Sequence, residues 1–233
     1  MSKARSRTED SHARDGTDGS SSVLIVDDHP IVRQGIRMLL DQQEDLCVCG
    51  EAESAAEALR VLNQDAPDVA VVDLTLKDSS GLELIKDIRA RWPDVRILVL
   101  SMRDEAFYAE RCLQAGARGY VTKEQGPTQV IEGIRAVLGG RVYLSEEMAS
   151  KVLSKFAAGG GEGGSPVQSL TDRELEIFQL IGAGLTLREI SQRLHVSPKT
   201  VDSHREHIKD KLGLDTANDL LKHAIQWVQM QGP

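Results

Sequence analysis

Aromatic residues are scarce in this chain, and so are cysteines. Only 3% of the residues are Phe, Trp or Tyr, so any core must be built mainly from Val, Leu, Ile and Ala. The three cysteines, Cys47, Cys49 and Cys112, are too few for a disulfide-stabilised scaffold and lack the spacing of a structural zinc site. Free thiols are typical of the reducing cytoplasm, which is the expected location.

Long hydrophobic runs and a strong positive charge are also missing. No stretch approaches the roughly 18 apolar residues of a membrane span, and no apolar signal segment stands near the N-terminus, so no membrane association is expected. Residues 22–145 carry 20 acidic against 14 basic side chains, and residues 166–233 carry 9 against 8. This balance excludes a general polyanion binder, so any DNA contact depends on a few well-placed cations and is sensitive to salt.

Composition divides the chain into four parts. Residues 1–21 contain almost no apolar side chains and are expected to be a disordered tail, either native or a cloning remnant. Residues 22–145 form the first folded unit, and residues 169–233 form the second. The Gly-rich run at 159–164 favours a flexible linker, which we place at 146–168.

The first unit shows five alternations of an apolar run with a helical pattern. The apolar runs begin at Val23, Leu46, Val69, Ile97 and Gly119. Runs that do not alternate with polar residues are buried on both faces, which is typical of parallel strands covered by helices. We therefore predict an α/β fold with a doubly wound, five-stranded parallel sheet, whose ligands bind at the carboxyl ends of the strands.

The second unit shows helix starts and no strand pattern. Thr171 and Thr186 are each followed three residues later by Glu, which is the capping-box spacing. Ser197-Pro198 and Thr216 mark two further starts, so we predict four short helices in an all-α domain. Two of them are joined by a tight turn, which fits a helix-turn-helix and a plain helical hairpin equally well.

Three carboxylates are expected to converge at one edge of the sheet. Asp27 and Asp28 follow the first strand and Asp73 follows the third, which is its neighbour in a doubly wound sheet. Such a cluster is repulsive without a cation, and oxygen ligands suit Mg²⁺. Ser101 ends the fourth strand and Lys123 follows the fifth. Together these groups predict a phosphoryl-transfer site with a carboxylate nucleophile.

Residues 23–140 resemble the receiver domain of bacterial two-component response regulators, which has a flavodoxin-like fold. The matching pieces are Val26-Asp27-Asp28-His29-Pro30, Val72-Asp73-Leu74, Ser80-Gly81-Leu82, Leu100-Ser101 and Ala115 to Lys123. The resemblance implies that Asp73 accepts a phosphoryl group from a sensor histidine kinase. It implies Mg²⁺ ligands on Asp28, Asp73 and the backbone carbonyl of Thr75, with Asp27 acting through water.

The resemblance also assigns the remaining roles. Ser101 and Lys123 would hold the phosphoryl oxygens, and Tyr120 would rotate inward when Ser101 moves. Many receivers have a proline, in a cis bond, where Glu124 follows Lys123 here, and many have another proline where Lys77 stands. Neither departure removes a chemical group from the site.

Residues 169–230 resemble the LuxR-type domain of the NarL/FixJ branch of regulators. The matching pieces are Leu170 to Glu174, Gly184-Leu185-Thr186 with Glu189-Ile190, Leu194 to Ser197, Lys199-Thr200-Val201, His204 and Lys211-Leu212-Gly213. In that branch the third helix lies in the major groove of double-stranded operator DNA. Its base-reading positions correspond to Asp202, Ser203 and Glu206, where several relatives place Lys or Arg at the first and third. Acids there repel phosphates, although Glu can accept from cytosine.

The expected DNA-contacting set joins base readers and phosphate contacts. Lys199, Thr200, Arg205 and Lys209 are the preferred phosphate contacts. The full set is Lys199, Thr200, Val201, Asp202, Ser203, Arg205, Glu206 and Lys209.

The sequence therefore predicts a transcriptional regulator switched by phosphorylation. In the branch, the unphosphorylated receiver often covers the recognition helix, and phosphorylation frees it and promotes homodimers. The last helix, with Leu221, Ile225 and Val228, is a candidate dimer surface unless it packs within its own domain. A signalling adaptor that binds a protein is the alternative, and an aspartyl-phosphate-type phosphatase or a phosphorylation-independent regulator has less support.

Overall fold

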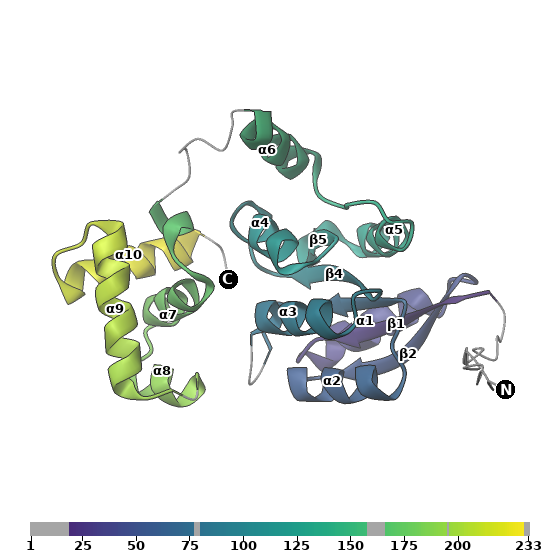
Figure 1. The fold of residues 1–233 in the computed structure, drawn as a ribbon, viewed down its shortest axis with the longest axis horizontal. Coiled ribbons are helices and arrows are strands. Elements are labelled where there is room, and N and C mark those ends of the chain that lie inside the picture. The colour runs from purple at the N-terminus through teal and green to yellow at the C-terminus, as the bar shows by residue number, and fades with distance from the viewer. Residues whose placement is uncertain (1–18, 77–79, 158–165, 195, 231–233) are drawn as a thin grey trace, which may run out of the picture.

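The protein is described here as a computed structural model covering residues 19–76, 80–157, 166–194 and 196–230. An α/β unit is followed by a helical unit, joined by a helix of the connecting segment (Figure 1). The expected tail lies almost wholly outside the described residues. No helix in the described ranges is long and apolar enough to cross a membrane.

The α/β unit is built on one parallel sheet. Its strands are β1 (Ser21–Val26), β2 (Leu46–Ala52), β3 (Val69–Val72), β4 (Arg96–Ser101) and β5 (Gly119–Thr122). They lie in the order β2-β1-β3-β4-β5, so the predicted doubly wound topology is confirmed. All four residues of β3 are buried, as a strand covered on both faces requires.

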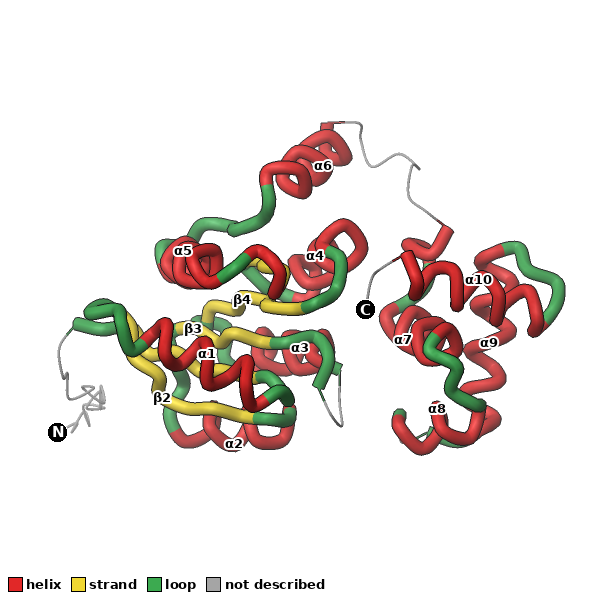
Figure 2. The backbone as a smooth tube through the Cα atoms, turned by 180° about the vertical axis from the view of Figure 1, so that it is seen from behind, coloured by secondary structure: helices red, strands yellow, loops and turns green. Residues whose placement is uncertain are grey.

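Helices cover both faces of the sheet (Figure 2). One face packs against α1 (Pro30–Leu40) and α5 (Pro127–Leu138). The other packs against α2 (Ala55–Gln64), α3 (Gly81–Arg91) and α4 (Glu105–Ala115). Aliphatic side chains fill both layers, with Tyr120 as the one fully buried tyrosine among the described residues.

The helical unit contains the four predicted helices. They are α7 (Asp172–Gly182), α8 (Leu187–Arg193), α9 (Pro198–Leu212) and α10 (Ala217–Met230). The predicted capping boxes form at Thr171 and Thr186, and Ser197 caps α9 by accepting from the Thr200 N–H. Helices α8 and α9 form the helix-turn-helix, with α9 as its second helix.

The segment expected to be a flexible linker contains ordered structure. Helix α6 (Glu146–Ala157) packs against α4, because Met148 and Val152 lie one turn apart and give it an apolar face. The Ser145 N–H, just before α6, also donates to Glu105 of α4 at 2.9 Å. A 3-10 turn, η2 (Pro166–Ser169), precedes α7, and only residues 158–165 of the segment lie outside the described residues.

The cysteines are free thiols. Cys112 is buried, whereas Cys47 and Cys49 are exposed on the edge strand β2. Partial desolvation raises the pKa of Cys49 to about 11, so this thiol is mainly protonated at neutral pH.

Candidate phosphorylation site and DNA interface

Two buried carboxylates and one ammonium group meet at the carboxyl edge of the sheet. Asp27 follows β1 and Asp73 follows β3, and these strands pair with Val26 opposite Val72. The side chains of Asp27 and Asp73 are only 1% and 3% exposed. The Lys123 Nζ, placed by the end of β5, lies 2.6 Å from Asp27 Oδ2 and 2.7 Å from Asp73 Oδ2. Asp27 and Asp73 therefore lie together at this edge, with the Lys123 ammonium between them.

Burial sets the electrostatics of this group. Desolvation raises the pKa of the Asp73 carboxyl, and the Lys123 charge opposes that shift. Desolvation alone would lower the pKa of Lys123, but the Asp73 and Asp27 carboxylates outweigh it and the pKa is raised. Lys123 is therefore a fixed cation at neutral pH.

Asp28 and His29 complete the acidic side of the site. His29 Nδ1 lies 2.7 Å from Asp28 Oδ1 and 3.2 Å from Asp27 Oδ1. Carboxylate oxygens of Asp27, Asp28 and Asp73 and a His29 nitrogen fall within 4.8 Å of one another. Three carboxylates face one lysine here, so the site carries an excess of negative charge. A hard divalent cation such as Mg²⁺ fits this oxygen-rich donor set.

The loop after Asp73 depends on a glycine. The Thr75 N–H donates to Asp73 Oδ1 at 3.3 Å, and the Gly81 N–H donates to the Leu74 carbonyl at 3.0 Å. A Cβ on Gly81 would lie 2.0 Å from the Asp73 carbonyl oxygen, so no other residue fits without moving the acidic loop. Gly81 is a site-shaping residue that the sequence marked only through its place in the Ser80-Gly81-Leu82 match.

Ser101 and Tyr120 are both tied to the backbone of Arg103. The Ser101 Oγ accepts from the Arg103 N–H at 3.3 Å, and the Tyr120 hydroxyl donates to the Arg103 carbonyl at 2.8 Å. Ser101 is fully buried and Tyr120 is 1% exposed. Tyr120 therefore already points inward, the position that the sequence reasoning reserved for the phosphorylated state. Nothing in the sequence marked Arg103, because its part is played by its backbone.

The departure at Glu124 leaves an ordinary backbone. No cis peptide bond occurs among the described residues, so the bond between Lys123 and Glu124 is trans. Lys123–Gln125 form a 3-10 turn that continues from β5. Lys77, the other departure, lies outside the described residues.

Helix α9 presents most of the expected DNA-contacting side chains to solvent. Lys199, Thr200, Asp202, Ser203 and Glu206 are exposed. Val201 is fully buried in the domain core beside Ile208. Since a residue with no exposed surface cannot touch DNA, Val201 is a packing residue and leaves the expected contact set.

Arg205 and Lys209 are paired along α9. Arg205 Nη1 lies 3.3 Å from Asp202 Oδ1, and Lys209 Nζ lies 2.8 Å from Glu206 Oε2. These two acids, at positions expected to read bases, thus partly neutralise the two cations expected to contact phosphates. The positive field of the helix is weak for this reason, in agreement with the near-neutral charge of the unit.

The two units meet where α4 contacts the start of α7. Arg111 Nη1 lies 3.0 Å from Asp172 Oδ1, and its Nη2 donates to the carbonyls of Leu170 at 2.7 Å and Gln168 at 3.1 Å. Lys86 of α3 lies 2.8 Å from the other Asp172 oxygen. Burial raises the pKa of Asp172, but Lys86 and Arg111 outweigh it and hold that pKa below its ordinary value.

An aromatic contact completes this boundary. The rings of Phe107 on α4 and Trp227 on α10 meet edge to face, with centroids 5.7 Å apart. Trp227 also contacts Phe178 of α7 at 5.8 Å. The apolar core of the helical unit is thereby continuous with one side of the receiver-like core.

The receiver-like unit does not cover the recognition helix in this arrangement. It contacts α7 and α10, while the Asp202 and Glu206 side chains of α9 remain 61% and 66% exposed. On α10, Val228 packs against the core of its own domain, and Leu221 stays exposed. The expected occlusion of α9 is therefore not seen.

Family models match both units. Residues 23–135 match the response regulator receiver domain, and residues 168–224 match the bacterial regulatory proteins of the luxR family. Oxygen regulatory protein NreC of Staphylococcus carnosus (strain TM300) is 35% identical over 88% of this chain and 96% of its own length. Transcriptional activator protein ExaE of Pseudomonas putida is 34% identical over 88% of this chain and 95% of its own.

Solved structures agree with this assignment over both units. RcsB from Salmonella enterica serovar Typhimurium, bound to promoter P1flhDC with the phosphomimetic BeF3-, is 31% identical with a TM-score of 0.66. That match covers 88% of this chain and 98% of the RcsB chain. Another RcsB structure, 30% identical, reaches a TM-score of 0.70 over 90% of this chain and 98% of its own. The chain therefore belongs to the LuxR-type (NarL/FixJ) response regulators, transcriptional regulators in which a receiver domain precedes a helix-turn-helix DNA-binding domain.

Proposed function

We propose that Asp73 is the phosphoacceptor and that its phosphorylation by a sensor histidine kinase controls operator binding by α9. The observation that carries this proposal is the pair of buried carboxylates, Asp27 and Asp73, in contact with the Lys123 ammonium at the ends of three strands. A carboxylate held beside a fixed cation, next to further acids, is the donor set that phosphoryl transfer needs.

The transfer forms a bond between an Asp73 carboxylate oxygen and phosphorus and breaks the bond between phosphorus and the kinase histidine. Mg²⁺, held by Asp27, Asp28, Asp73 and the Thr75 carbonyl, would supply positive charge to the phosphoryl oxygens. The Lys123 ammonium now contacts both Asp27 and Asp73. After transfer it would instead contact a phosphoryl oxygen on Asp73, which lies within reach of the same side chain.

The signal then has a route through Arg103. The Ser101 hydroxyl accepts from the Arg103 N–H, and its own O–H remains available to donate to a phosphoryl oxygen. The Arg103 carbonyl accepts from Tyr120, so a phosphoryl group bound by Ser101 is linked through Arg103 to Tyr120. Arg103 lies two residues before α4, and α4 carries both Phe107 and Arg111. A shift at the phosphorylation site therefore bears on the contacts that hold the DNA-binding domain.

We infer that this shift changes domain docking and dimerisation rather than uncovering a buried helix. The exposure of α9 in the docked arrangement supports this reading. The RcsB structures include one of two dimers bound to two parallel DNAs, and the exposed Leu221 on α10 leaves an apolar side chain for a second copy. Exposed free thiols at Cys47 and Cys49 fit a cytoplasmic protein.

Acetyl phosphate with Mg²⁺ tests the phosphoacceptor directly. The intact mass of the wild type should rise by one phosphoryl group, and that of Asp73→Asn should not. An equal gain in the variant would move the acceptor elsewhere. A generic phosphate ester turned over steadily by the wild type would favour the phosphatase alternative.

The adaptor alternative rests on Asp202 and Glu206, which weaken the positive field of α9. Retention on an operator fragment that falls with salt, without retention on random DNA, would reject it. Capture of a protein partner with no DNA retention would favour it.

A further inference from the structure

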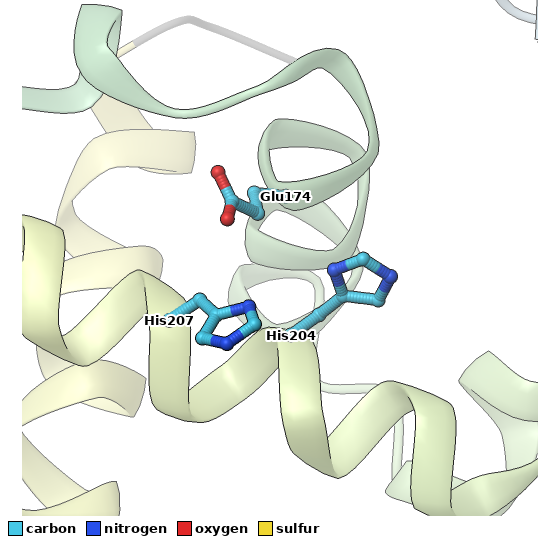
Figure 3. Close-up of side chains that lie close together, drawn as sticks. All are labelled: Glu174, His204 and His207. Atoms are coloured by element: carbon cyan, nitrogen blue, oxygen red, sulfur yellow. The ribbon is translucent and has the colours of Figure 1, made fainter.

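A second cluster of metal-ligating groups lies in the DNA-binding domain, far in sequence from the acidic site. Glu174 stands in the first turn of α7, and His204 and His207 stand one turn apart on α9. One ligand atom from each lies within 4.8 Å of the other two. Figure 3 shows the three side chains at the contact between these two helices.

The existing hydrogen bonds leave part of this cluster unused. Glu174 is buried, and its Oε2 accepts from the Thr171 N–H and from Lys211 Nζ, each at 2.7 Å. The Nδ1 of the half-buried His204 is inaccessible to solvent and has no hydrogen-bond partner among the described residues. A buried polar atom without a partner is unfavourable and needs an explanation, such as an ion. His207 is exposed, so its ring is free to turn toward the other two.

We propose that Glu174, His204 and His207 form a binding site for a divalent transition metal of the Zn²⁺ class. Two imidazoles and one carboxylate are a donor set that Zn²⁺ takes readily, with water in the fourth position. Bonds of about 2.0–2.1 Å place tetrahedral ligand atoms about 3.3 Å apart, so the side chains must close by rotation. The imidazole nitrogens separate this site from the oxygen-rich site at Asp73, which suits Mg²⁺.

Lys211 is the competitor at this site. Its ammonium occupies one oxygen of Glu174 and repels a second cation nearby. The Lys211 side chain is 36% exposed, so the ammonium can move into water when a metal binds. Removing the Lys211 charge should therefore tighten metal binding, which a purely structural Glu174 would not explain.

An occupied site would join α7 directly to the recognition helix. The metal would add positive charge beside α9, where Arg205 and Lys209 are paired with acids. It would also bind the folded state and not the unfolded one, so it would raise the melting temperature of the full-length chain.

Zn²⁺ titration calorimetry on the full-length chain tests this site. The titration is made with Mg²⁺ in excess, to fill the acidic site, and in a Cys47→Ser, Cys49→Ser background, because exposed thiols also bind Zn²⁺. We expect one site whose affinity falls at least tenfold in His207→Gln and is unchanged in His223→Gln, a matched exposed histidine on α10. Lys211→Gln should bind more tightly than the parent.

Cobalt gives a readout of the ligands themselves. Co²⁺ bound to the parent should show the strong visible absorption of tetrahedral coordination, and His207→Gln should lose it. Equal Zn²⁺ affinity in His207→Gln and His223→Gln, or no tightening in Lys211→Gln, would overturn the proposal.

Discussion

Replacing Arg111 with alanine is expected to release the DNA-binding domain from the receiver. The Arg111 side chain is 14% exposed and makes three hydrogen bonds to α7 and the turn before it. A hydrogen bond to a charged group contributes about 1.5–3 kcal/mol. Two of the three bonds are part-buried and the bond to Gln168 is exposed. Asp172 is 32% exposed, so solvent screening reduces the contribution of its ion pair with Arg111. We therefore expect Arg111→Ala to lower the free energy of docking between the two units by about 3 kcal/mol in total. At 1.4 kcal/mol per tenfold, docking would weaken by about a hundredfold.

Trp227 reports this release, because it contacts Phe107 only while the domains are docked. In a Trp92→Phe background, its fluorescence should shift to longer wavelength in Arg111→Ala, and small-angle scattering should show a larger radius of gyration. Arg60→Ala, which removes an exposed arginine paired with Glu57 within α2, is the matched control and should leave both signals unchanged. Wild-type fluorescence and scattering from a folded Arg111→Ala protein would refute this account of the boundary.

The same contact predicts how docking responds to pH. Lys86 and Arg111 hold the pKa of Asp172 below its ordinary value despite burial. The stabilisation of docking by ionised Asp172 is therefore fully present above about pH 4, the ordinary pKa of an aspartate. It is lost as the pH falls through the lowered pKa of Asp172 in the docked state. The Trp227 signal should stay constant between pH 8 and pH 5, and change on acidification, and this acid transition should be absent in Asp172→Asn.

Three further outcomes follow from the site and the recognition helix. Gly81→Ala should lose about 1–3 kcal/mol of stability in urea and much of its phosphorylation by acetyl phosphate, because the new Cβ collides with the Asp73 carbonyl. Lys123→Met leaves two buried carboxylates unpaired, so it should be destabilised by about 3–5 kcal/mol at pH 7.5. Since the pKa of Asp73 is raised in the fold and would rise further, this variant should regain stability on acidification to pH 5. Glu206→Gln frees Lys209 for phosphate, so DNA affinity should increase and its salt dependence should steepen by about one unit.

Each of these variants has a matched control in the chain. Gly35→Ala, on an open part of α1, should stabilise by about 0.5–1 kcal/mol. Lys151→Met and Glu147→Gln break an exposed, solvent-screened pair on α6 and should leave the stability to unfolding nearly unchanged. The packing argument fails if Gly35→Ala is destabilised as much as Gly81→Ala. The electrostatic argument fails if the stability of Lys123→Met does not depend on pH. The argument for Lys209 fails if Glu206→Gln leaves the salt dependence of DNA binding unchanged.

Sequence patterns were sufficient for the sheet and for the acidic cluster. Apolar strands that do not alternate specify burial on both faces, and topology then brings residues that follow β1 and β3 together, as Asp27 and Asp73 show. The caps at Thr171 and Thr186 are local, since three residues determine each one. Local patterns of this kind can be read without a structure.

Features that depend on packing between elements could not be read in this way. Helix α6 has only a short apolar face, and it is stabilised by packing against α4. The amino-acid composition of residues 146–168 alone carries no information about that contact. Val201 is the exception, because Val201, Ile208 and Leu212 share one apolar face of the helical wheel and that period already indicates its burial, although it stands among the expected DNA contacts. The part played by Arg103 uses backbone atoms, which leave no trace in the residue types.

The central claim, that phosphorylation of Asp73 changes the assembly state of the protein, is tested most directly by light scattering. The molar mass is measured with Mg²⁺ before and after addition of beryllofluoride, for the wild type and for Asp73→Asn. We predict a monomer that becomes a dimer in the wild type and a monomer under both conditions in the variant. A wild-type mass that does not change, or an equal change in Asp73→Asn, would contradict the claim.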